Sequence, residues 1–251
     1  MKKYILFCCF QAILFFGHAQ QARIETAVYS IPSTASEKVF PLFNGAGAVL
    51  SKQSLSLNFL KSKKKYRYTT TVDGDELFFI IKEGPVVLLL NKKEYTLDKG
   101  SVVFVLPGDE VSFISNNKDD AAIYEMHLNA EGRNLQRGQQ AGPSFAMNWN
   151  DMVFKPHDKG GVRQLFDRKT VTMNRFDIHI TTLNPGLKSH DPHTHVNEEI
   201  ILMIDGVGEM QLGDKKSTIT NGGAAWVESL IPHNITNIAN RPATYFAIQW
   251  N

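Results

Sequence analysis

The sequence repeats itself at one constant spacing, and this repeat restricts the possible fold more than any other feature. Gly84 and Gly206 lie 122 positions apart, and each follows an apolar run. The same spacing aligns Asn91–Lys93 with Gly213–Lys215, Thr96–Leu97 with Thr218–Ile219, Gly100 with Gly222, and Phe104–Val105 with Trp226–Val227. One spacing that aligns several features without a gap indicates two copies of a single structural unit.

Each copy is predicted to be built from short β-strands. The first copy contains closely spaced runs of β-branched and aromatic residues, at Leu77–Ile81, Val86–Leu90, Tyr95–Leu97, Val102–Leu106 and Val111–Ile114. Many short strands separated by turns are typical of sandwiches and barrels. Only Glu131–Gln140 has a pattern that could form a short helix. The predicted fold class is therefore all-β, with two barrels in tandem.

The ends of these copies give the predicted domain boundaries. Residues 1–20 resemble a signal peptide, because Met1–Lys3 is basic, Tyr4–Phe16 is apolar, and Gly17–Ala19 offers small residues for cleavage. The first copy is expected over residues 21–130 and the second over 162–251. A connector rich in Gly, Gln, Asn and Pro is expected between them, over residues 131–161.

The predicted signal peptide indicates export to a bacterial periplasm or secretion. Its apolar run is shorter than the about 20 residues that a membrane-spanning helix needs, so no membrane span is expected after cleavage. An uncleaved anchor is the alternative. Both cysteines, Cys8 and Cys9, lie within this run. The mature chain would therefore have no disulfide, no thiol nucleophile and no thiolate metal ligand. The formal net charge of +2 does not favour nucleic acid as a partner.

The residues that carry chemistry are concentrated in the second copy. His193, His195 and Glu199 are two and four residues apart, and all have odd numbers, so on a strand they would share one face. The apolar run Ile200–Ile204 is expected to supply that strand. A His-x-His pair alone is common on surfaces. The added Glu199 and the later Pro-His at His233 complete three imidazoles and one carboxylate, a set that suits a divalent first-row metal.

These residues also carry a family resemblance. Gly186 followed by His193, His195, Glu199 and Gly206 resembles the first sequence motif of the cupin superfamily, and Pro232–His233 with Asn237 resembles the end of the second. The resemblance implies two double-stranded β-helix (jelly-roll, RmlC-like) barrels, a bicupin, with one metal such as Mn, Fe, Ni or Zn in the second barrel. Its ligands would be His193, His195, Glu199 and His233.

The first copy lacks the corresponding ligands. The spacing of 122 matches the four predicted ligands with Thr71, Asp73, Leu77 and Val111, of which only Asp73 could bind a metal. The first barrel is therefore expected to be degenerate, free of metal and structural. The neighbouring acids Asp75, Glu76, Asp109 and Glu110 are interpreted as turn and rim residues.

Four further residues are candidates for contacts with a substrate. His190 lies in the loop before His193 and could meet a substrate or replace a ligand. Arg175 and His179 share parity in a strand expected over Met173–Thr182, and could supply an anion contact and a proton carrier. Gln249 could face the cavity. The alternatives are an exposed loop for His190 and an outward polar face for Arg175 and His179. Asn237 is expected to fix a turn or to orient a ligand.

The layout is also distantly similar to that of ureidoglycine aminohydrolase-type bicupins, whose metal set is Glu/His/His/Gln rather than the His/His/Glu/His set of this chain. The hypothesis from sequence is a metal-dependent hydrolase, isomerase or dioxygenase. It would act on a small polar molecule with a carbonyl or carboxylate group, or on a sugar acid. The alternative is a non-catalytic barrel that captures a metabolite or sugar. A homodimer is a further possibility.

Overall fold

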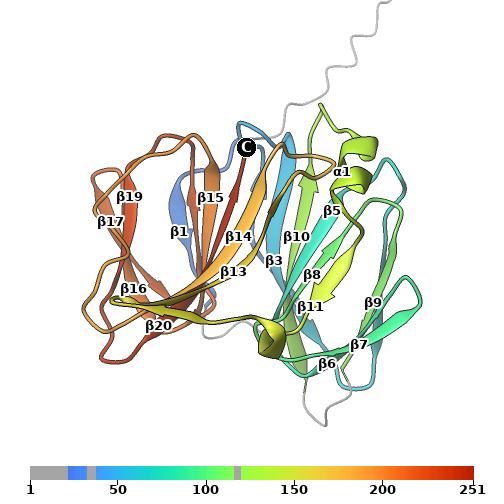
Figure 1. Cartoon of the computed structure of the whole chain (residues 1–251), viewed down its shortest axis with the longest axis horizontal. Helices are drawn as coiled ribbons and strands as arrows, with labels where there is room; N and C mark the ends of the chain where they lie inside the picture. The colour runs from blue at the N-terminus through green and yellow to red at the C-terminus, as the bar shows by residue number, and fades with distance from the viewer. Residues whose placement is uncertain (1–21, 33–37, 116–119) are drawn as a thin grey trace, which may run out of the picture.

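The chain folds into two β-barrels that lie side by side (Figure 1). The structure, a computed structural model, describes residues 22–32, 38–115 and 120–251. The predicted signal peptide, residues 1–20, lies outside the described residues. The prediction of an all-β fold with two barrels is confirmed. Within the described ranges, none of the helices has the length and apolarity required to cross a membrane.

The first barrel consists of a larger and a smaller antiparallel sheet. The larger sheet has six strands, in the order β11 (Phe145–Met147), β8 (Val102–Val105), β5 (Glu76–Glu83), β10 (Ala121–Asn129), β3 (Lys52–Leu60) and β2 (Val39–Gly45). The smaller sheet has four, in the order β4 (Lys65–Thr69), β9 (Glu110–Ile114), β6 (Val86–Leu90) and β7 (Lys93–Leu97). The five strands predicted for this copy correspond to β5 to β9.

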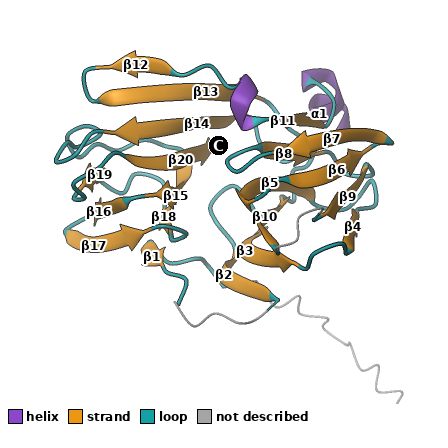
Figure 2. Cartoon of the chain, turned by 90° about the horizontal axis from the view of Figure 1, so that it is seen from below, coloured by secondary structure: helices purple, strands orange, loops and turns teal. Residues whose placement is uncertain are grey.

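The second barrel repeats this plan. Its larger sheet has seven strands, in the order β1 (Ala27–Tyr29), β18 (Ala224–Val227), β15 (Glu198–Asp205), β20 (Ala243–Trp250), β14 (Phe176–Leu183), β13 (Gly160–Arg168) and β12 (Lys155–His157). Figure 2 shows the last three strands in succession at one end of the sheet. The smaller sheet has the order β17 (Lys215–Thr220), β16 (Val207–Leu212) and β19 (His233–Asn237).

The two copies match in register as well as in strand order. Ile80 pairs with Tyr124 in the first barrel, and Leu202 pairs with Phe246 in the second, so both partners shift by the predicted spacing. Gly100 and Gly222 both have positive φ. The N–H of Gly100 donates to the carbonyl of Ile81 on β5, and the N–H of Gly222 donates to the carbonyl of Met203 on β15. Glycine takes this conformation without steric cost, which explains why both copies have it there.

Alternation along the central strands divides the apolar residues among three cores. On β15, Ile200 and Leu202 belong to a core between the two barrels, whereas Ile201 and Met203 face the interior of their own barrel. The strand β5 divides its residues in the same way. The larger sheets thus pack against each other at the centre of the molecule, and the smaller sheets lie outermost (Figure 1).

Short segments outside the two repeats add strands to the barrels. The strand β1, near the start of the described chain, pairs with β18 of the second barrel. The strand β11, from the predicted connector, pairs with β8 of the first barrel. The connector also contains α1 (Leu135–Ala141), which overlaps the predicted helical segment Glu131–Gln140, and a short 3₁₀ helix, η1 (Trp149–Asp151). The domain boundaries drawn from the sequence remain predictions. The pairing of β11 with β8 crosses one of them, since β11 lies in the predicted connector and β8 in the first barrel.

Two buried glutamates join the barrels by reciprocal contacts. Glu76, at the start of β5, accepts hydrogen bonds from the backbone N–H groups of Val171 and Thr172 and from the hydroxyls of Thr170 and Thr172. Its side chain is fully buried, so the interpretation of Glu76 as a turn or rim residue is wrong. The loop that it binds comes directly before β14 of the other barrel.

Glu198 makes the equivalent contacts in the opposite direction. It lies at the start of β15, 122 positions after Glu76, and accepts from the N–H groups of Ala48 and Val49 in the loop before β3. The indole N–H of Trp250 donates to the same carboxylate at 3.1 Å. A Cβ on Gly47 would lie 2.5 Å from both carboxylate oxygens, so glycine is needed there for the close approach.

A polar network occupies the mouth of the first barrel. The side chain of His127, on β10, lies between two carboxylates: its Nδ1 is 3.0 Å from Asp75 and its Nε2 is 2.6 Å from Glu125. These hydrogen bonds raise the pKa of His127 to about 9. The hydrogen bond from His127 also lowers the pKa of Asp75. At neutral pH the ring is therefore an imidazolium.

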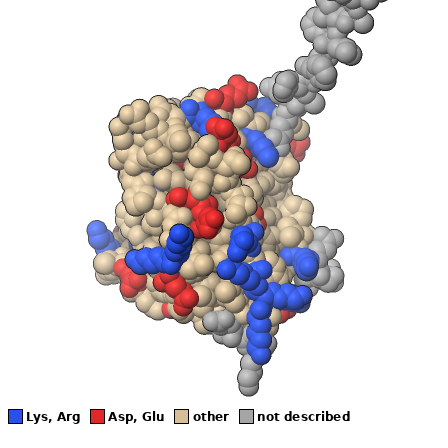
Figure 3. All heavy atoms as spheres, turned by 90° about the vertical axis from the view of Figure 1, so that its right-hand side faces the viewer, with Lys and Arg blue, Asp and Glu red and all other residues tan. Residues whose placement is uncertain are grey.

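The outer face of the first barrel has no uniform charge. The basic segment Lys61–Arg67 includes the start of β4 and is mostly exposed. Lys61 is paired there with Asp120. In Figure 3, Lys and Arg side chains gather on this face but Asp and Glu are interspersed with them. This distribution agrees with a solvated surface.

We expect the replacement of Glu76 by Gln to lower the free energy of unfolding by about 2–4 kcal/mol, because an amide N–H₂ would then face buried donors. Glu198→Gln should have a similar effect. The control is Glu83→Gln, on a side chain that is 51% exposed. Urea unfolding of the three variants measures the difference, and equal stabilities would contradict the assigned role.

The raised pKa of His127 predicts a pH-dependent stability. Its contribution is complete below the ordinary pKa of 6.5 and is lost as the pH rises through about 9, because unfolding in this range releases the proton that the folded chain holds on His127. We expect the difference in melting temperature between wild type and His127→Gln to shrink across this range. His157→Gln, on an exposed histidine, is the control and should show no such convergence.

Candidate metal centre

The predicted metal ligands come from one irregular loop and two strands. Glu199 is the second residue of β15, and His233 is the first residue of β19. His193 and His195 lie before β15, not on it, so they are not on one continuous strand with Glu199. An isolated bridge between His193 and His233, with N–H···O distances of 3.3 and 3.1 Å, holds the loop against β19.

This loop replaces a regular strand of the first barrel. There, β4 pairs along its length with β9, and Tyr68 lies opposite Val111. In the second barrel this loop forms bridges to β19 only at Lys188 and His193, and the segment between them includes Pro192, which has no N–H to donate. His193 pairs with His233 as Tyr68 pairs with Val111, so strand pairing matches His193 with Tyr68 rather than with Thr71.

The three imidazoles converge on one point. Their ring centroids are separated by 5.3 Å (His193 to His195), 4.9 Å (His193 to His233) and 4.8 Å (His195 to His233). Each ring offers one nitrogen, and these three atoms lie within 4.8 Å of one another. This separation allows three imidazole nitrogens to bind one ion.

Hydrogen bonds to the backbone determine which nitrogen faces the site. Nδ1 of His195 is 2.9 Å from the carbonyl oxygen of Asn197, and Nδ1 of His233 is 2.8 Å from that of Ile231. A carbonyl can only accept, so Nδ1 carries the proton in both rings. In the neutral ring, Nε2 is then left with its lone pair. Both Nε2 atoms are buried and have no hydrogen-bond partner among the described residues.

These lone pairs face the carboxylate of Glu199. One oxygen, Oε2, lies 2.8 Å from Nε2 of His233 and 3.4 Å from Nε2 of His195. The other oxygen, Oε1, accepts from the amide of Gln249 at 3.0 Å, and Asn197 in turn donates to Gln249. Two acceptors so close together repel each other unless a proton or a metal ion lies between them.

The electrostatics of the site favour a charged carboxylate at Glu199. Burial by itself would raise the pKa of Glu199, but the adjacent Nε2 atoms of His195 and His233, where they carry a proton, hold this pKa well below its ordinary value. Burial and the neighbouring imidazoles lower the pKa of His193, whereas Glu199 raises that of His195. The donor set of three imidazoles and one carboxylate fits a divalent first-row metal, which would replace the proton.

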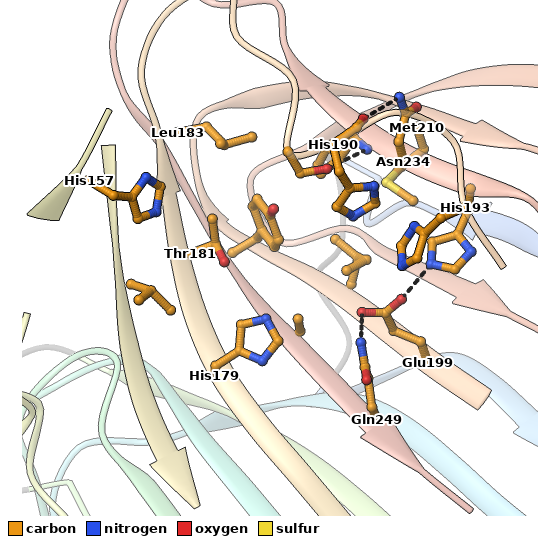
Figure 4. Close-up of a pocket in the computed structure, with 17 residues that line it drawn as sticks. His157, His179, Thr181, Leu183, His190, His193, Glu199, Met210, Asn234 and Gln249 are labelled. Atoms are coloured by element: carbon orange, nitrogen blue, oxygen red, sulfur yellow. Dashed lines mark hydrogen bonds and ion pairs between the residues drawn. The ribbon is translucent and has the colours of Figure 1, made fainter. Parts of the chain in front are cut away.

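The candidate ligands lie at one end of a cavity of about 320 Å³ in the second barrel. His190, His193, Glu199, His233 and Gln249 line this end. His157 and His179 lie across the cavity from His193 and Glu199, with Thr181 beside them (Figure 4). Much of the remaining wall is apolar, and includes Val162, Leu183, Ile201, Met210 and Ile235. The cavity thus has a polar group of residues at each end.

The other predicted site residues divide into two groups. His190, His179 and Gln249 all line the cavity. The ring centroids of His190 and His193 are 3.9 Å apart. Arg175 does not line it. The guanidinium instead binds Asp167 and Asp177, which explains its position away from the cavity. Asn237 fixes a turn, since it donates to the carbonyls of Leu183 and Arg241.

Sequence reasoning missed His157. It belongs to the short strand β12, within the segment interpreted as a connector, and the structure adds this strand to the edge of the larger sheet of the second barrel. Only the Lys-Pro-His sequence before a glycine pair could have indicated a strand there. Nothing local to it indicated the cavity.

Two family profiles match separate parts of the sequence. The cupin domain profile matches residues 179–249, and the AraC-like ligand binding domain profile matches residues 61–168. No curated protein matches the sequence.

Solved structures with the same fold cover most of the chain. AerE from Microcystis aeruginosa superposes with a TM-score of 0.65 at 10% identity, over 88% of this chain and 96% of its own. Salicylate 1,2-dioxygenase from Pseudaminobacter salicylatoxidans has a TM-score of 0.64 at 11% identity, over 84% and 75%. Oxalate decarboxylase from Lactobacillus farciminis has 0.62 at 11%, over 79% and 77%. At these identities the likeness establishes the fold.

We expect the protein, purified without chelator, to contain one divalent metal ion per chain. The His193→Ala/His195→Ala variant should lose it, because two of the three converging nitrogens are removed. His157→Gln is the matched control and should keep the metal. Elemental analysis by mass spectrometry measures the content. A wild-type protein that stays free of metal after incubation with Mn, Fe, Ni and Zn would contradict the assignment.

Proposed function

Since the chain belongs to the cupin superfamily and has two barrels, we propose that its second barrel is a metal-dependent enzyme site for a small carbonyl- or carboxylate-bearing metabolite or sugar acid. His193, His195, His233 and Glu199 would hold one divalent transition metal. Hydrolysis, isomerisation and dioxygenation are all compatible with this site. Export through residues 1–20 is part of the proposal.

One observation carries this proposal. The lone pair of His233 Nε2 and the charged Oε2 of Glu199 face each other at 2.8 Å inside the protein, and Nε2 has no hydrogen-bond partner among the described residues. Burial of two acceptors in contact is costly. A shared metal ion removes this cost, and it would also use the nitrogens of His193 and His195.

The surrounding residues hold the ligands in place. Gln249 binds the second oxygen of Glu199, and backbone carbonyls fix the rings of His195 and His233. Such outer contacts orient metal ligands and fix their tautomers. When bound, the metal supplies positive charge that polarises a carbonyl or carboxylate oxygen. Ligands from one loop, β15 and β19 thus form a single site, and Gln249 of β20 supports it.

The cavity indicates the kind of substrate. Its volume of about 320 Å³ is at the lower end of ligand pockets, which run from about 300 to 1,000 Å³. His179 is half-buried on the wall opposite Glu199, so its imidazole can exchange a proton with a molecule that spans the cavity (Figure 4). The salicylate dioxygenase and the oxalate decarboxylase with the same fold act, as their names state, on small carboxylates.

Capture without catalysis is the second candidate function. It is favoured by the match of residues 61–168 to an AraC-like ligand binding domain. In this case the metal would only orient the bound molecule. The two functions differ in the role of His179, which exchanges a proton in the first and only contacts the ligand in the second.

The test begins with a screen of small keto acids and sugar acids for thermal stabilisation of the metal-loaded protein, followed by product analysis of each stabilising compound. If the site is catalytic, we expect His179→Asn to lower kcat about 10²- to 10⁴-fold, because a general acid–base group is lost. Metal content should be unchanged in this variant. Arg175→Gln, outside the cavity, is the control. Stabilisation without any product in wild type would favour capture instead.

A further inference from the structure

Opposite Glu199, the far end of the cavity in the second barrel is formed by His157, His179 and Thr181 (Figure 4). His157 reaches it from outside the repeat, as the last residue of β12, which pairs with β13 at the edge of the larger sheet. In the first barrel β2 pairs with β3 as β13 pairs with β14, and β2 is the outermost strand there among the described residues. The second cavity thus has a histidine that the repeat does not supply.

The hairpin that carries His157 is fixed both to the sheet and to the loop that bears two of the predicted metal ligands. Gly160, which pairs with His157, packs so closely on β14 that a Cβ would lie 2.1 Å from the carbonyl oxygen of Thr182. The ammonium of Lys159, in the turn of the hairpin, donates to the carbonyl of Ser189 in that loop at 2.8 Å. The fold therefore determines where His157 lies relative to the metal centre.

The ring of His157 offers a proton where the metal-binding rings offer a lone pair. Its Nδ1 accepts from the backbone N–H of Lys159 at 3.2 Å, so in the neutral ring the proton is on Nε2, on the side away from the hairpin turn. The carboxylate of Asp158 lies 3.7 Å from Nδ1 and is 90% exposed. A second proton on Nδ1 would leave the proton on Nε2 in place. His157 is therefore a donor through Nε2 in both states, whereas His195 and His233 have a bare Nε2.

The charges of the cavity favour an acidic group at each end. Glu199 is the only carboxylate among the lining residues, and five of these residues are histidines. A divalent ion on Glu199 would leave that end positive, because its two charges exceed the one charge of the carboxylate. At the far end a second anionic group would meet donors and no acidic lining residue. Val162 and Ile201 are among the apolar residues of the remaining wall, which suits an apolar chain between two acidic groups.

We propose that the second barrel selects dicarboxylates and that His157 is the residue that determines this specificity. One carboxylate, or a keto-acid group, reaches the metal, and the other accepts a hydrogen bond from Nε2 of His157. The chain between them passes His179. This inference rests on the proposed metal centre, and it narrows the substrates from acids in general to those with a second carboxylate at the far end.

The experiment is calorimetric titration of the protein with its metal bound, after removal of unbound metal. The probes are the dicarboxylates from malonate to pimelate and the monocarboxylates of the same chain lengths, from propionate to heptanoate. We expect the best-fitting dicarboxylate to bind to wild type about tenfold or more tightly than its monocarboxylate, because a charge-assisted hydrogen bond is gained. Elemental analysis after the titration checks that the metal stays bound.

Two substitutions of His157 test its role, and both should fold because this residue is exposed. His157→Phe keeps an aromatic ring but has no N–H. It should remove the preference for the dicarboxylate and leave the affinity for the monocarboxylate unchanged. His157→Gln keeps an N–H donor and should preserve part of the preference. Arg175→Gln, outside the cavity, is the control and should leave both affinities unchanged.

Equal affinity for the two series in wild type, or an equal loss of both in His157→Phe, would overturn the role of His157. Binding of neither series to the metal-loaded protein would also overturn it. Product analysis separates this inference from the proposed function. Dicarboxylates that bind through His157 without being converted would contradict catalysis alone. Conversion of monocarboxylates by wild type and His157→Phe at equal rates, without preference for dicarboxylates, would contradict the role of His157 alone.

Discussion

The reciprocal binding of two loops by two buried carboxylates determines how the rest of this molecule is arranged. Glu76 and Glu198 begin equivalent strands. Glu76 accepts hydrogen bonds from the loop before β14, and Glu198 accepts them from the loop before β3, the equivalent strand of the other barrel. A buried carboxylate is stable only when its oxygens are bound by donors, so neither barrel can complete this contact alone. Each glutamate also determines which way the side chains of its strand face. Because side chains alternate, the next residue points into its own barrel, and this residue is Leu77 in the first copy and Glu199 in the second.

One frame therefore presents two chemically different mouths. In the first barrel, Leu77 and Val111 are apolar and fully packed, and the neighbouring segment forms the regular strand β4. In the second, Glu199 and His233 take their places, and the segment matching β4 becomes a loop that carries His193 and His195. The loss of regular strand pairing has a consequence for the site. Two histidines separated by one residue on a flat strand would not both direct their ring nitrogens toward a common point near β19. The loop lets both rings turn toward β19.

Sequence patterns predicted what depends on local order or on repetition. The constant spacing predicted the two barrels, and the alternation of side chains along a strand agrees with the opposite directions of Glu199, which faces the cavity, and Glu198, which binds the other barrel. Patterns could not reveal contacts made between distant segments. The role of Glu76 depends on a loop 94 to 96 positions away in the chain. His157 lines the cavity because it lies on β12, a strand too short to show a periodic pattern in the sequence. Arg175 had the position in sequence expected of a cavity residue, but its guanidinium forms ion pairs with Asp167 and Asp177 and does not line the cavity.

The difference between the two mouths comes down to where a positive charge is kept. His127 has carboxylates against both ring nitrogens, so the protein itself retains a proton there, and the cation is built in. His195 and His233 each spend Nδ1 on a backbone carbonyl, which leaves one bare nitrogen per ring facing a single carboxylate. Neither of these rings can satisfy that carboxylate with its own Nδ1 proton. The second mouth can therefore take up a proton or a metal ion between these groups, whereas in the first mouth His127 already lies between two carboxylates. The same fold thus gives its two mouths different electrostatics by the choice of partner for an imidazole nitrogen.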